Sequence, residues 1–304
     1  TTAESNTAVG YDALGANATG SNNVAVGASC LDANLGSENV GMGVHALGAN
    51  TTGTYNTAVG RNALAGNTTG DYNVAIGGVA LDANTTASYN TAVGTAALGA
   101  STTAANNVAV GYHALNLNTT ANNNTAVGFD SLAVNTTGTG NVALGAYALD
   151  ATTTADANVA LGSYALTTNI TGAQNTAVGH AALNDNTTAS NNTAVGYLAL
   201  YANSGGANNT AIGTTAGDAI TTGSNNINIG YAADSDSDAE NQIVMGVSIT
   251  STWDNVFVFG KASNVTYNSF DTNNTWTQAS DVRKKKNIED AVLGLDFVND
   301  LRPV

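Results

Sequence analysis

Apolar and polar residues alternate in a unit that recurs along most of the chain, and residues 56–72 show one copy, N-T-A-V-G-R-N-A-L-A-G-N-T-T-G-D-Y. A glycine follows each small apolar triplet and marks the register. These marker glycines are Gly10, Gly27, Gly43, Gly60, Gly77, Gly94, Gly111, Gly128, Gly145, Gly162, Gly179, Gly196, Gly213 and Gly230. Successive marker glycines are 17 residues apart, except Gly27 and Gly43, which are 16 apart. A period this strict predicts stacked coils instead of a globule.

Each unit predicts a short β-strand that ends at the marker glycine, as in the segment from Asn73 to Gly77. Side chains alternate along a strand, so Val74 and Ile76 share one face and Ala75 takes the other. The middle position is alanine or glycine until Asn228, so we expect that face to approach another backbone closely.

A leucine follows each branched apolar residue by five positions and predicts a ladder through the stacked coils. Its members are Leu14, Leu31, Leu47, Leu64, Leu81, Leu98, Leu115, Leu132, Leu149, Leu166, Leu183 and Leu200. We expect each coil to enclose one branched residue, one leucine and some alanine. The Asn-Thr-Thr-Gly/Ala segment predicts a polar corner.

These columns predict an all-β fold, a parallel β-solenoid or β-roll of about fourteen 17-residue coils over residues 1–230. The period breaks after Gly230, so residues 231–279 predict a cap and neck. Apolar residues in 280–304, among them Ile288, Val292 and Leu295, follow helical spacing and predict a short C-terminal α-helical segment. Ordering the backbone costs about 1 to 2 kcal/mol per residue. A coil this narrow buries little apolar surface in return, so we expect an intertwined homotrimer.

The charge distribution excludes some partners. Residues 1–280 hold two basic residues, Arg61 and Lys261, against 17 acidic residues, whereas residues 281–304 hold five of each sign. Without a basic stripe to neutralise phosphates, we expect no nucleic-acid partner. No run of 18 apolar residues occurs, so we expect no membrane insertion. The chain begins at Thr1 within a repeat, and we expect it to be a piece of a longer polypeptide.

Several side chains are candidates for binding. The histidines His45, His113 and His180 would form imidazole rings around a threefold axis, a geometry that binds anions or metals. The alternating acids Asp234, Asp236 and Asp238 suit Ca²⁺, although the glycine and distal glutamate of a helix-loop-helix calcium site are missing. The plainer interpretations are isolated histidines and a solvated acidic loop. We therefore expect neither metal nor cofactor. Cys30 stands where most repeats carry alanine, so we expect a small buried residue and no disulfide.

Two outward columns invite functional interpretations. The two positions after the marker glycine vary most and include Tyr112, Phe129 and Tyr147. They predict either a glycan-contacting side wall or tyrosines that cover a groove. A threonine column would suit ice binding if a second ladder ran beside it: Thr52, Thr69, Thr86, Thr103, Thr120, Thr137, Thr154, Thr171 and Thr188. Neighbouring threonines such as Thr68 and Thr69 point to opposite faces. We therefore expect only one outward ladder and no ice binding.

The N-x-A-V/I-G strand and its small-residue turn resemble the head repeats of trimeric autotransporter adhesins over about residues 6–230. Those heads form left-handed parallel β-rolls as intertwined trimers, and similar repeats occur in phage tail fibres. The unit here is longer than the usual head repeat. The resemblance implies a parallel β architecture and a trimer.

Residues 280–304 resemble the start of the endosialidase-type intramolecular chaperone domain found at the C-termini of phage tail spikes and fibres. The family reads S-D-x-R-L-K-x-N-I and then G-L-x-F-I-x-x-L-x-P-V. The matching residues here are Ser280, Asp281, Arg283, Lys285, Asn287, Ile288, Gly294, Leu295, Phe297, Leu301, Pro303 and Val304. Lys284 replaces the usual leucine.

This resemblance implies trimerisation and, in many members, self-cleavage before the serine. Ser280 would attack the Ala279 carbonyl, Lys285 would carry the proton, and Asp281 would orient the site. The other interpretation is that Ser280 or Asp281 caps the helix.

Together these features predict a structural and host-attachment fibre, most simply a phage tail or virion fibre located in the virion. The alternative is a bacterial cell-surface trimeric adhesin or extracellular appendage subunit. The expected partners are two further copies of the chain, a host cell-surface glycan or protein receptor, and other virion or fibre components. Apart from cleavage at Ser280 we expect no enzyme, because no pair of acids recurs in a pocket as polysaccharide hydrolysis requires.

Overall fold

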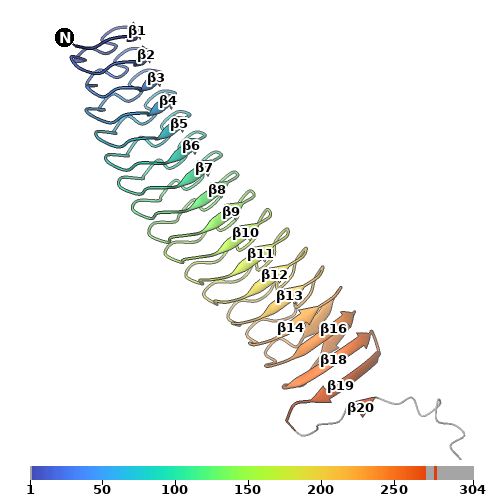
Figure 1. Cartoon of the computed structure of the whole chain (residues 1–304). Helices are drawn as coiled ribbons and strands as arrows, with labels where there is room; N and C mark the ends of the chain where they lie inside the picture. The colour runs from blue at the N-terminus through green and yellow to red at the C-terminus, as the bar shows by residue number, and fades with distance from the viewer. Residues whose placement is uncertain (1, 272–276, 279–304) are drawn as a thin grey trace, which may run out of the picture.

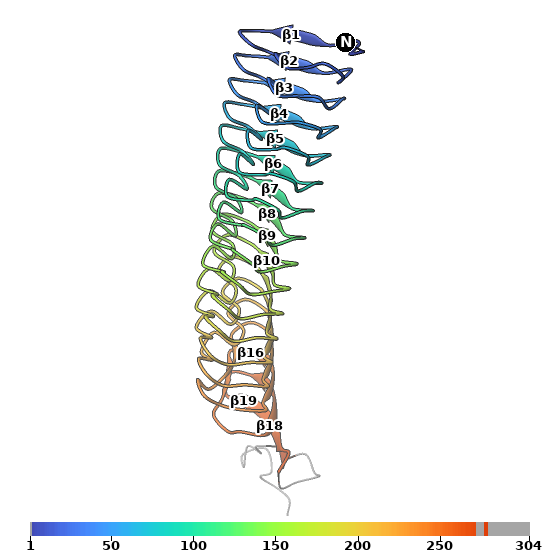
Figure 2. The same cartoon turned by 90° about the vertical axis from the view of Figure 1, so that its left-hand side faces the viewer.

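The computed structural model describes residues 2–271 and 277–278. The chain winds into coils that stack as a long rod, with the strands aligned along one side (Figure 1). A view turned by 90° shows that the rod curves gently along its length (Figure 2). The all-β parallel β-solenoid predicted from the repeat is confirmed, with about fifteen coils.

Each coil contributes one three-residue strand at the predicted place before its marker glycine. The strands are β1 (Thr7–Val9), β2 (Val24–Val26), β3 (Val40–Met42), β4 (Thr57–Val59), β5 (Val74–Ile76), β6 (Thr91–Val93), β7 (Val108–Val110), β8 (Thr125–Val127), β9 (Val142–Leu144), β10 (Val159–Leu161), β11 (Thr176–Val178), β12 (Thr193–Val195), β13 (Thr210–Ile212) and β14 (Ile227–Ile229). Neighbouring strands pair in parallel and place equivalent residues side by side, as Ala75 beside Ala92. Equivalent residues of successive repeats therefore pair with each other in the sheet.

The short 16-residue interval does not disturb the sheet. Val24 of β2 pairs with Val40 of β3, the same register that the other coils keep. The missing residue lies in the turn, where Asn34-Leu35-Gly36 replaces Asn-Thr-Thr-Gly. Because this turn lies outside the strand ladder, a deletion there shortens one coil without shifting the pairing.

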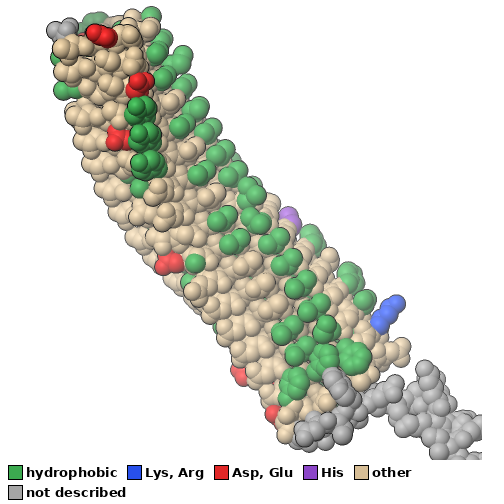
Figure 3. Space-filling view, in the orientation of Figure 1, with side chains coloured by type: hydrophobic (Ala, Val, Ile, Leu, Met, Phe, Trp, Pro, Cys, Tyr) green, Lys and Arg blue, Asp and Glu red, His purple; other side chains and the backbone are tan. Residues whose placement is uncertain are grey.

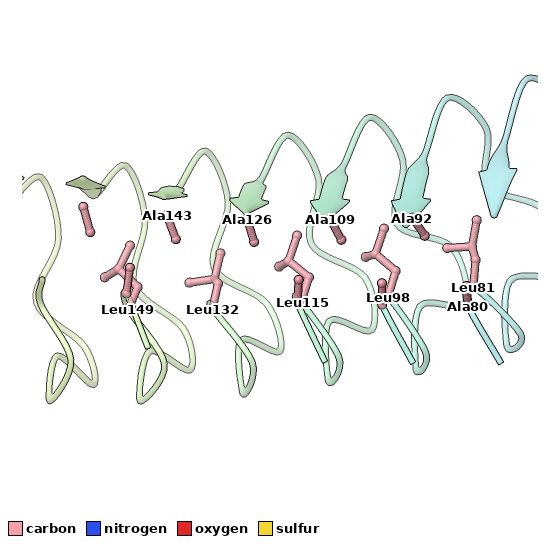
Figure 4. Close-up of a cluster of buried hydrophobic side chains, with 14 of the residues drawn as sticks. Ala80, Leu81, Ala92, Leu98, Ala109, Leu115, Ala126, Leu132, Ala143 and Leu149 are labelled. Atoms are coloured by element: carbon pink, nitrogen blue, oxygen red, sulfur yellow. The ribbon is translucent and has the colours of Figure 1, made fainter. Parts of the chain in front are cut away.

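The interior is narrower and less branched than we expected. From the second coil onward, the middle strand alanines and the leucines have no exposed surface and face each other inside the coil, as Ala92 and Leu98 do (Figure 4). The expectation that a branched residue fills the coil is wrong: Val74 is half-buried and Ile76 is 40% exposed. The space between the walls accepts an alanine side chain, so the bulkier strand residues point outward.

Two backbone conformations make this interior possible. Ala80 and Leu81 are consecutive, yet both are fully buried, because Leu81 lies in the left-handed region with a φ of 54°. The backbone amide of Leu81 donates to the Ala97 carbonyl at 3.0 Å and anchors this turn to the next coil. At the marker position Gly60, with a φ of +136°, an added Cβ would lie 2.5 Å from the Gly77 oxygen. A side chain there would push adjacent coils apart.

Two buried asparagine ladders complete the core, and the sequence analysis assigned one of them to a polar corner. The turn asparagines, such as Asn67, donate from Nδ2 to the Asn50 Oδ1 at 2.8 Å and to the Gly70 carbonyl at 3.0 Å. The strand asparagines precede each strand. Asn56 Oδ1 accepts the backbone amide of Asn73 at 2.9 Å. Buried amides with partners in the adjacent coil satisfy the backbone of the turns.

The solenoid continues beyond Gly230 with larger residues. β16 (Ile243–Val247) and β18 (Val256–Lys261) extend the main sheet in parallel, and Gly246 pairs with Gly260. β15 (Ala233–Ser235) pairs with β17 (Ile249–Ser251) in a separate two-stranded sheet.

An antiparallel hairpin ends the stack. β18 pairs antiparallel with β19 (Asn264–Ser269), which pairs antiparallel with β20 (Thr277–Gln278). This reversal ends the parallel stacking. In the described part of the chain, no helix has the length and apolarity needed to span a bilayer. The predicted C-terminal helical segment, residues 280–304, lies outside the described residues.

Candidate association surface

The outer face of the strand ladder carries an unbroken apolar column, which we call the apolar stripe. It consists of the residue immediately before each marker glycine or its equivalent: Val9, Val26, Met42, Val59, Ile76, Val93, Val110, Val127, Leu144, Leu161, Val178, Val195, Ile212, Ile229, Met245 and Phe259. Columns of hydrophobic side chains run along the strand side of the rod (Figure 3). Leu144 is 48% exposed and Ile212 is 44% exposed in the single chain.

The apolar stripe is partly exposed in the single chain, yet every one of its residues is apolar. Beside it, the first strand residues hold only threonine, valine, isoleucine or phenylalanine, so the outer strand face of β1 to β14, β16 and β18 is free of charge before Lys261. Other exposed columns vary freely: the position after the marker glycine holds Arg61 in one coil and Thr95 in another. A large exposed apolar patch commonly marks an interaction site. The stripe therefore has the composition of a covered surface.

The stripe widens into an apolar hollow at its C-terminal end. A cavity of about 840 Å³ is lined by Ile229, Met245, Val247, Phe257 and Phe259, together with two marker glycines. The rings of Phe257 and Phe259 lie 5.5 Å apart. The hollow is continuous with the apolar stripe, because Ile229, Met245 and Phe259 belong to both.

The variable corner after the marker glycine holds a continuous aromatic ladder. Rings from successive coils contact one another in the order Tyr112, Phe129, Tyr147, Tyr164, His180 and Tyr197. The Tyr147 and Tyr164 rings are 5.2 Å apart and 14° from parallel. Stacking covers ring faces, which are the surfaces that sugars would use. This geometry favours a role in holding coils together and leaves ring edges and hydroxyls for glycan contact.

A second, shorter ladder is formed by Tyr55, Tyr72 and Tyr89, each just before a strand asparagine. Their rings stack 5.0 and 5.3 Å apart and are parallel within 3°. In the nearby turns, the Thr68 hydroxyl donates to the Thr85 carbonyl at 2.9 Å, while Thr69 is exposed. In the next coil both Thr85 and Thr86 are exposed, so the expectation that only one threonine ladder faces outward does not hold in every coil.

The three histidines do not meet within one chain. His45, His113 and His180 are 68 and 67 residues apart, which corresponds to about four coils in each case. His113 Nδ1 lies 3.5 Å from Asp130 Oδ1, so this histidine has a carboxylate partner from the next coil, contrary to expectation. Among the residues that the structure describes, no three His, Cys, Asp or Glu side chains converge as a metal site would require.

The acidic segment near residue 234 is not a uniformly solvated loop, as we had expected. Asp234 lies in β15 and is buried, whereas Asp236 and Asp238 are exposed, so the three carboxylates do not share one site. Burial, the charge of Asp218 and a hydrogen bond with that carboxyl raise the pKa of Asp234 to about 7. The two carboxyls thus interact where the leucine ladder ends.

A polar hollow lies on another side of the rod, among the second to fifth coils. Its volume is about 400 Å³, and Asp32, His45, Asn62 and Asp82 lie around small residues. Burial raises the pKa of Asp82. Cys30 is fully buried, as expected, and burial raises the pKa of its thiol to about 11, which leaves it protonated and unreactive at neutral pH.

The predicted self-cleavage residues Ser280, Asp281 and Lys285 lie outside the described residues. The apolar stripe is the surface that the sequence analysis missed. A signal was present, because the residue before the marker glycine never becomes polar or charged in any coil.

Comparisons with known proteins gave no matching family model, no similar curated protein and no similar solved structure.

Proposed function

We propose that the chain forms the shaft of a homotrimeric structural and host-attachment fibre, a phage tail or virion fibre. The observation that carries this proposal is the apolar stripe: an exposed column, as long as the rod, that stays apolar in every coil. Three chains that turn this face toward a common axis would cover it.

The energetics favour association. Burying a valine, leucine or isoleucine side chain completely contributes about 1.5–3 kcal/mol. Val9, Leu144 and Ile212 are between 44% and 58% exposed, so covering each contributes roughly 1 kcal/mol. Seven of the sixteen stripe residues are at least 38% exposed, so covering them contributes about 7 kcal/mol per chain, and the nine half-buried members add less each. That is comparable to the whole stability of an ordinary domain.

The fibre role draws support from shape and from resemblance. A rod of uniform coils with a variable corner provides length and a surface whose residues can change without harming the fold. The chaperone-like residues 280–304 resemble those of phage fibres, and the repeat resembles adhesin heads. The receptor contact would lie on the variable corner or beyond the described residues. A host cell-surface glycan or protein is the expected partner, together with other virion or fibre components.

The second candidate is a bacterial cell-surface trimeric adhesin or appendage subunit, which the repeat alone supports equally well. The chaperone resemblance favours the virion, because that domain occurs at the C-termini of phage tail spikes and fibres. Fractionation separates the two: immunodetection should find the chain in purified virions under the first proposal and in the bacterial envelope under the second.

Two measurements test the proposal. Sedimentation equilibrium of the rod should give the mass of three chains; a monomer at micromolar concentration would exclude the trimeric shaft. Purified rod should also compete with virion adsorption to host cells. Trimers that leave adsorption unchanged would limit the chain to a structural role.

A further inference from the structure

The acceptor tripeptide for N-linked glycosylation, Asn-x-Thr, recurs in this chain at two structurally opposite places. Seven copies begin at buried turn asparagines: Asn50, Asn67, Asn84, Asn118, Asn135, Asn169 and Asn186. Four others begin at exposed asparagines: Asn123, Asn191 and Asn208 ahead of the strands, and Asn264 in β19. One more begins at Asn17, a half-buried turn asparagine in the first coil, and one at Asn273 lies outside the described residues. The motif ordinarily indicates a surface loop, so the buried set needs a physical explanation.

A glycan on a turn asparagine is incompatible with the fold. Asn67 has no exposed surface, and its Nδ2 donates to the Asn50 Oδ1 and to the Gly70 carbonyl. Glycosylation replaces a hydrogen on this same nitrogen with a sugar. The coil would lose a buried hydrogen bond, and its close-packed interior has no room for a sugar.

The same geometry repeats in other coils. Asn84 Nδ2 donates to Asn67 Oδ1 at 2.8 Å and to the Ala87 carbonyl at 3.0 Å, and Asn186 Nδ2 donates to Asn169 Oδ1 at 2.8 Å. A glycan on Asn84 therefore also disturbs the hydrogen bond that Asn67 Oδ1 accepts in the neighbouring coil. Several modified coils in one chain would interrupt the stack at several places.

We infer that this chain folds in a compartment where Asn-x-Thr motifs are not glycosylated. Oligosaccharide transfer in a glycosylating secretory pathway acts on the chain before it folds, when the turn asparagines are accessible. Each transfer would then block closure of a coil. The inference is independent of the number of chains in the fibre, because the turn asparagines lie inside each chain.

The structure also provides a way to remove the motif without touching the ladder. The third residue of each buried copy is an exposed threonine whose hydroxyl makes no hydrogen bond with the described residues: Thr52, Thr69, Thr86, Thr120, Thr137, Thr171 and Thr188. Changing all seven to alanine removes the acceptor motif from the seven fully buried asparagines and keeps every asparagine. The copies at Asn17 and at the exposed asparagines remain in this variant.

The test expresses the whole chain in one eukaryotic cell line by two routes, in the cytosol and behind a secretory leader. We expect the cytosolic chain to be unmodified and to yield a thermolysin-resistant rod. The secreted chain should gain mass that peptide N-glycosidase removes, with glycans mapped to turn asparagines, and should lose the resistant rod.

Two controls separate glycosylation from other effects of secretion. The sevenfold Thr→Ala variant, first checked as a resistant rod in the cytosol, should become resistant on the secretory route. The wild-type chain should also be thermolysin-resistant on the secretory route when synthesis of the lipid-linked oligosaccharide is blocked. The inference is overturned if secreted wild type is thermolysin-resistant, with or without glycans on its turn asparagines. It is equally overturned if secreted wild type stays sensitive when glycan transfer is blocked.

Discussion

Replacing Ile76 with aspartate tests whether the apolar stripe is covered in the assembled protein. Ile76 is 40% exposed in the single chain and contributes nothing to the coil interior. In an isolated chain, a substitution at such a surface position changes stability by about 0.5 kcal/mol or less. The single-chain structure alone therefore predicts almost no effect.

Association changes that expectation. If three copies of the stripe meet, one layer of the fibre receives three carboxylates. The one basic side chain in the adjacent coil, Arg61, lies exposed at the variable corner after Gly60 and outside the stripe. An unpaired charge placed in a buried site costs about 3 to 5 kcal/mol. Each chain also loses roughly 1 kcal/mol of apolar burial. For three chains, we therefore expect Ile76→Asp to destabilise the trimer by roughly 12 to 18 kcal/mol in total.

The assay compares Ile76→Asp with Thr69→Asp, which places the same charge on an exposed position of the same coil. Sedimentation equilibrium over a range of concentrations should give three chains for wild type and Thr69→Asp, and single or unfolded chains for Ile76→Asp. Thermal unfolding followed by circular dichroism should show the same order. The reasoning is refuted if both variants keep three chains and unfold at the same temperature.

Three further predictions concern the interior, the end of the rod and the C-terminal residues. Leu98→Asp should lower the unfolding temperature sharply whether or not the chains associate, because Leu98 is fully buried and an unpaired charge there costs about 3 to 5 kcal/mol; an unchanged melting curve would contradict the leucine ladder. The pKa of Asp234 is raised from 3.8 to about 7, so its stabilising contribution is complete below pH 4 and disappears as the pH rises through 7. Asp234→Asn should therefore flatten the pH dependence of stability between pH 4 and 8, and a profile identical to wild type would exclude this carboxyl as its source. If the chaperone resemblance extends to chemistry, the chain with its C-terminal continuation should release a fragment beginning at Ser280; Ser280→Ala or Lys285→Ala should stay whole on a denaturing gel, and identical migration of wild type and variants would indicate a non-cleaving member.

The sequence by itself determined the coil, its length and the position of its strand. A marker glycine every 17 residues fixes which residues stack, because parallel coils of equal length place equivalent residues side by side. The same regularity gave the leucine ladder and the buried Cys30. Each of these features depends only on the residue type at one position of the repeat. Comparing that position between repeats was therefore sufficient to predict it.

The tertiary structure decided which strand face lies inside. Alternation separates Val74 and Ile76 from Ala75, but all three are apolar, and pattern alone does not indicate which set is buried. Left-handed backbone at Leu81 brings consecutive residues inward and narrows the coil, so alanine fits and branched residues do not. The same narrowing buries Asn67, a turn residue that the sequence suggests is exposed. Its amide donates to Asn50 Oδ1 in the adjacent coil and to the Gly70 carbonyl in its own turn. Which face is interior depends on the distance between opposite walls of the coil, and that distance is set by the backbone angles of the turns.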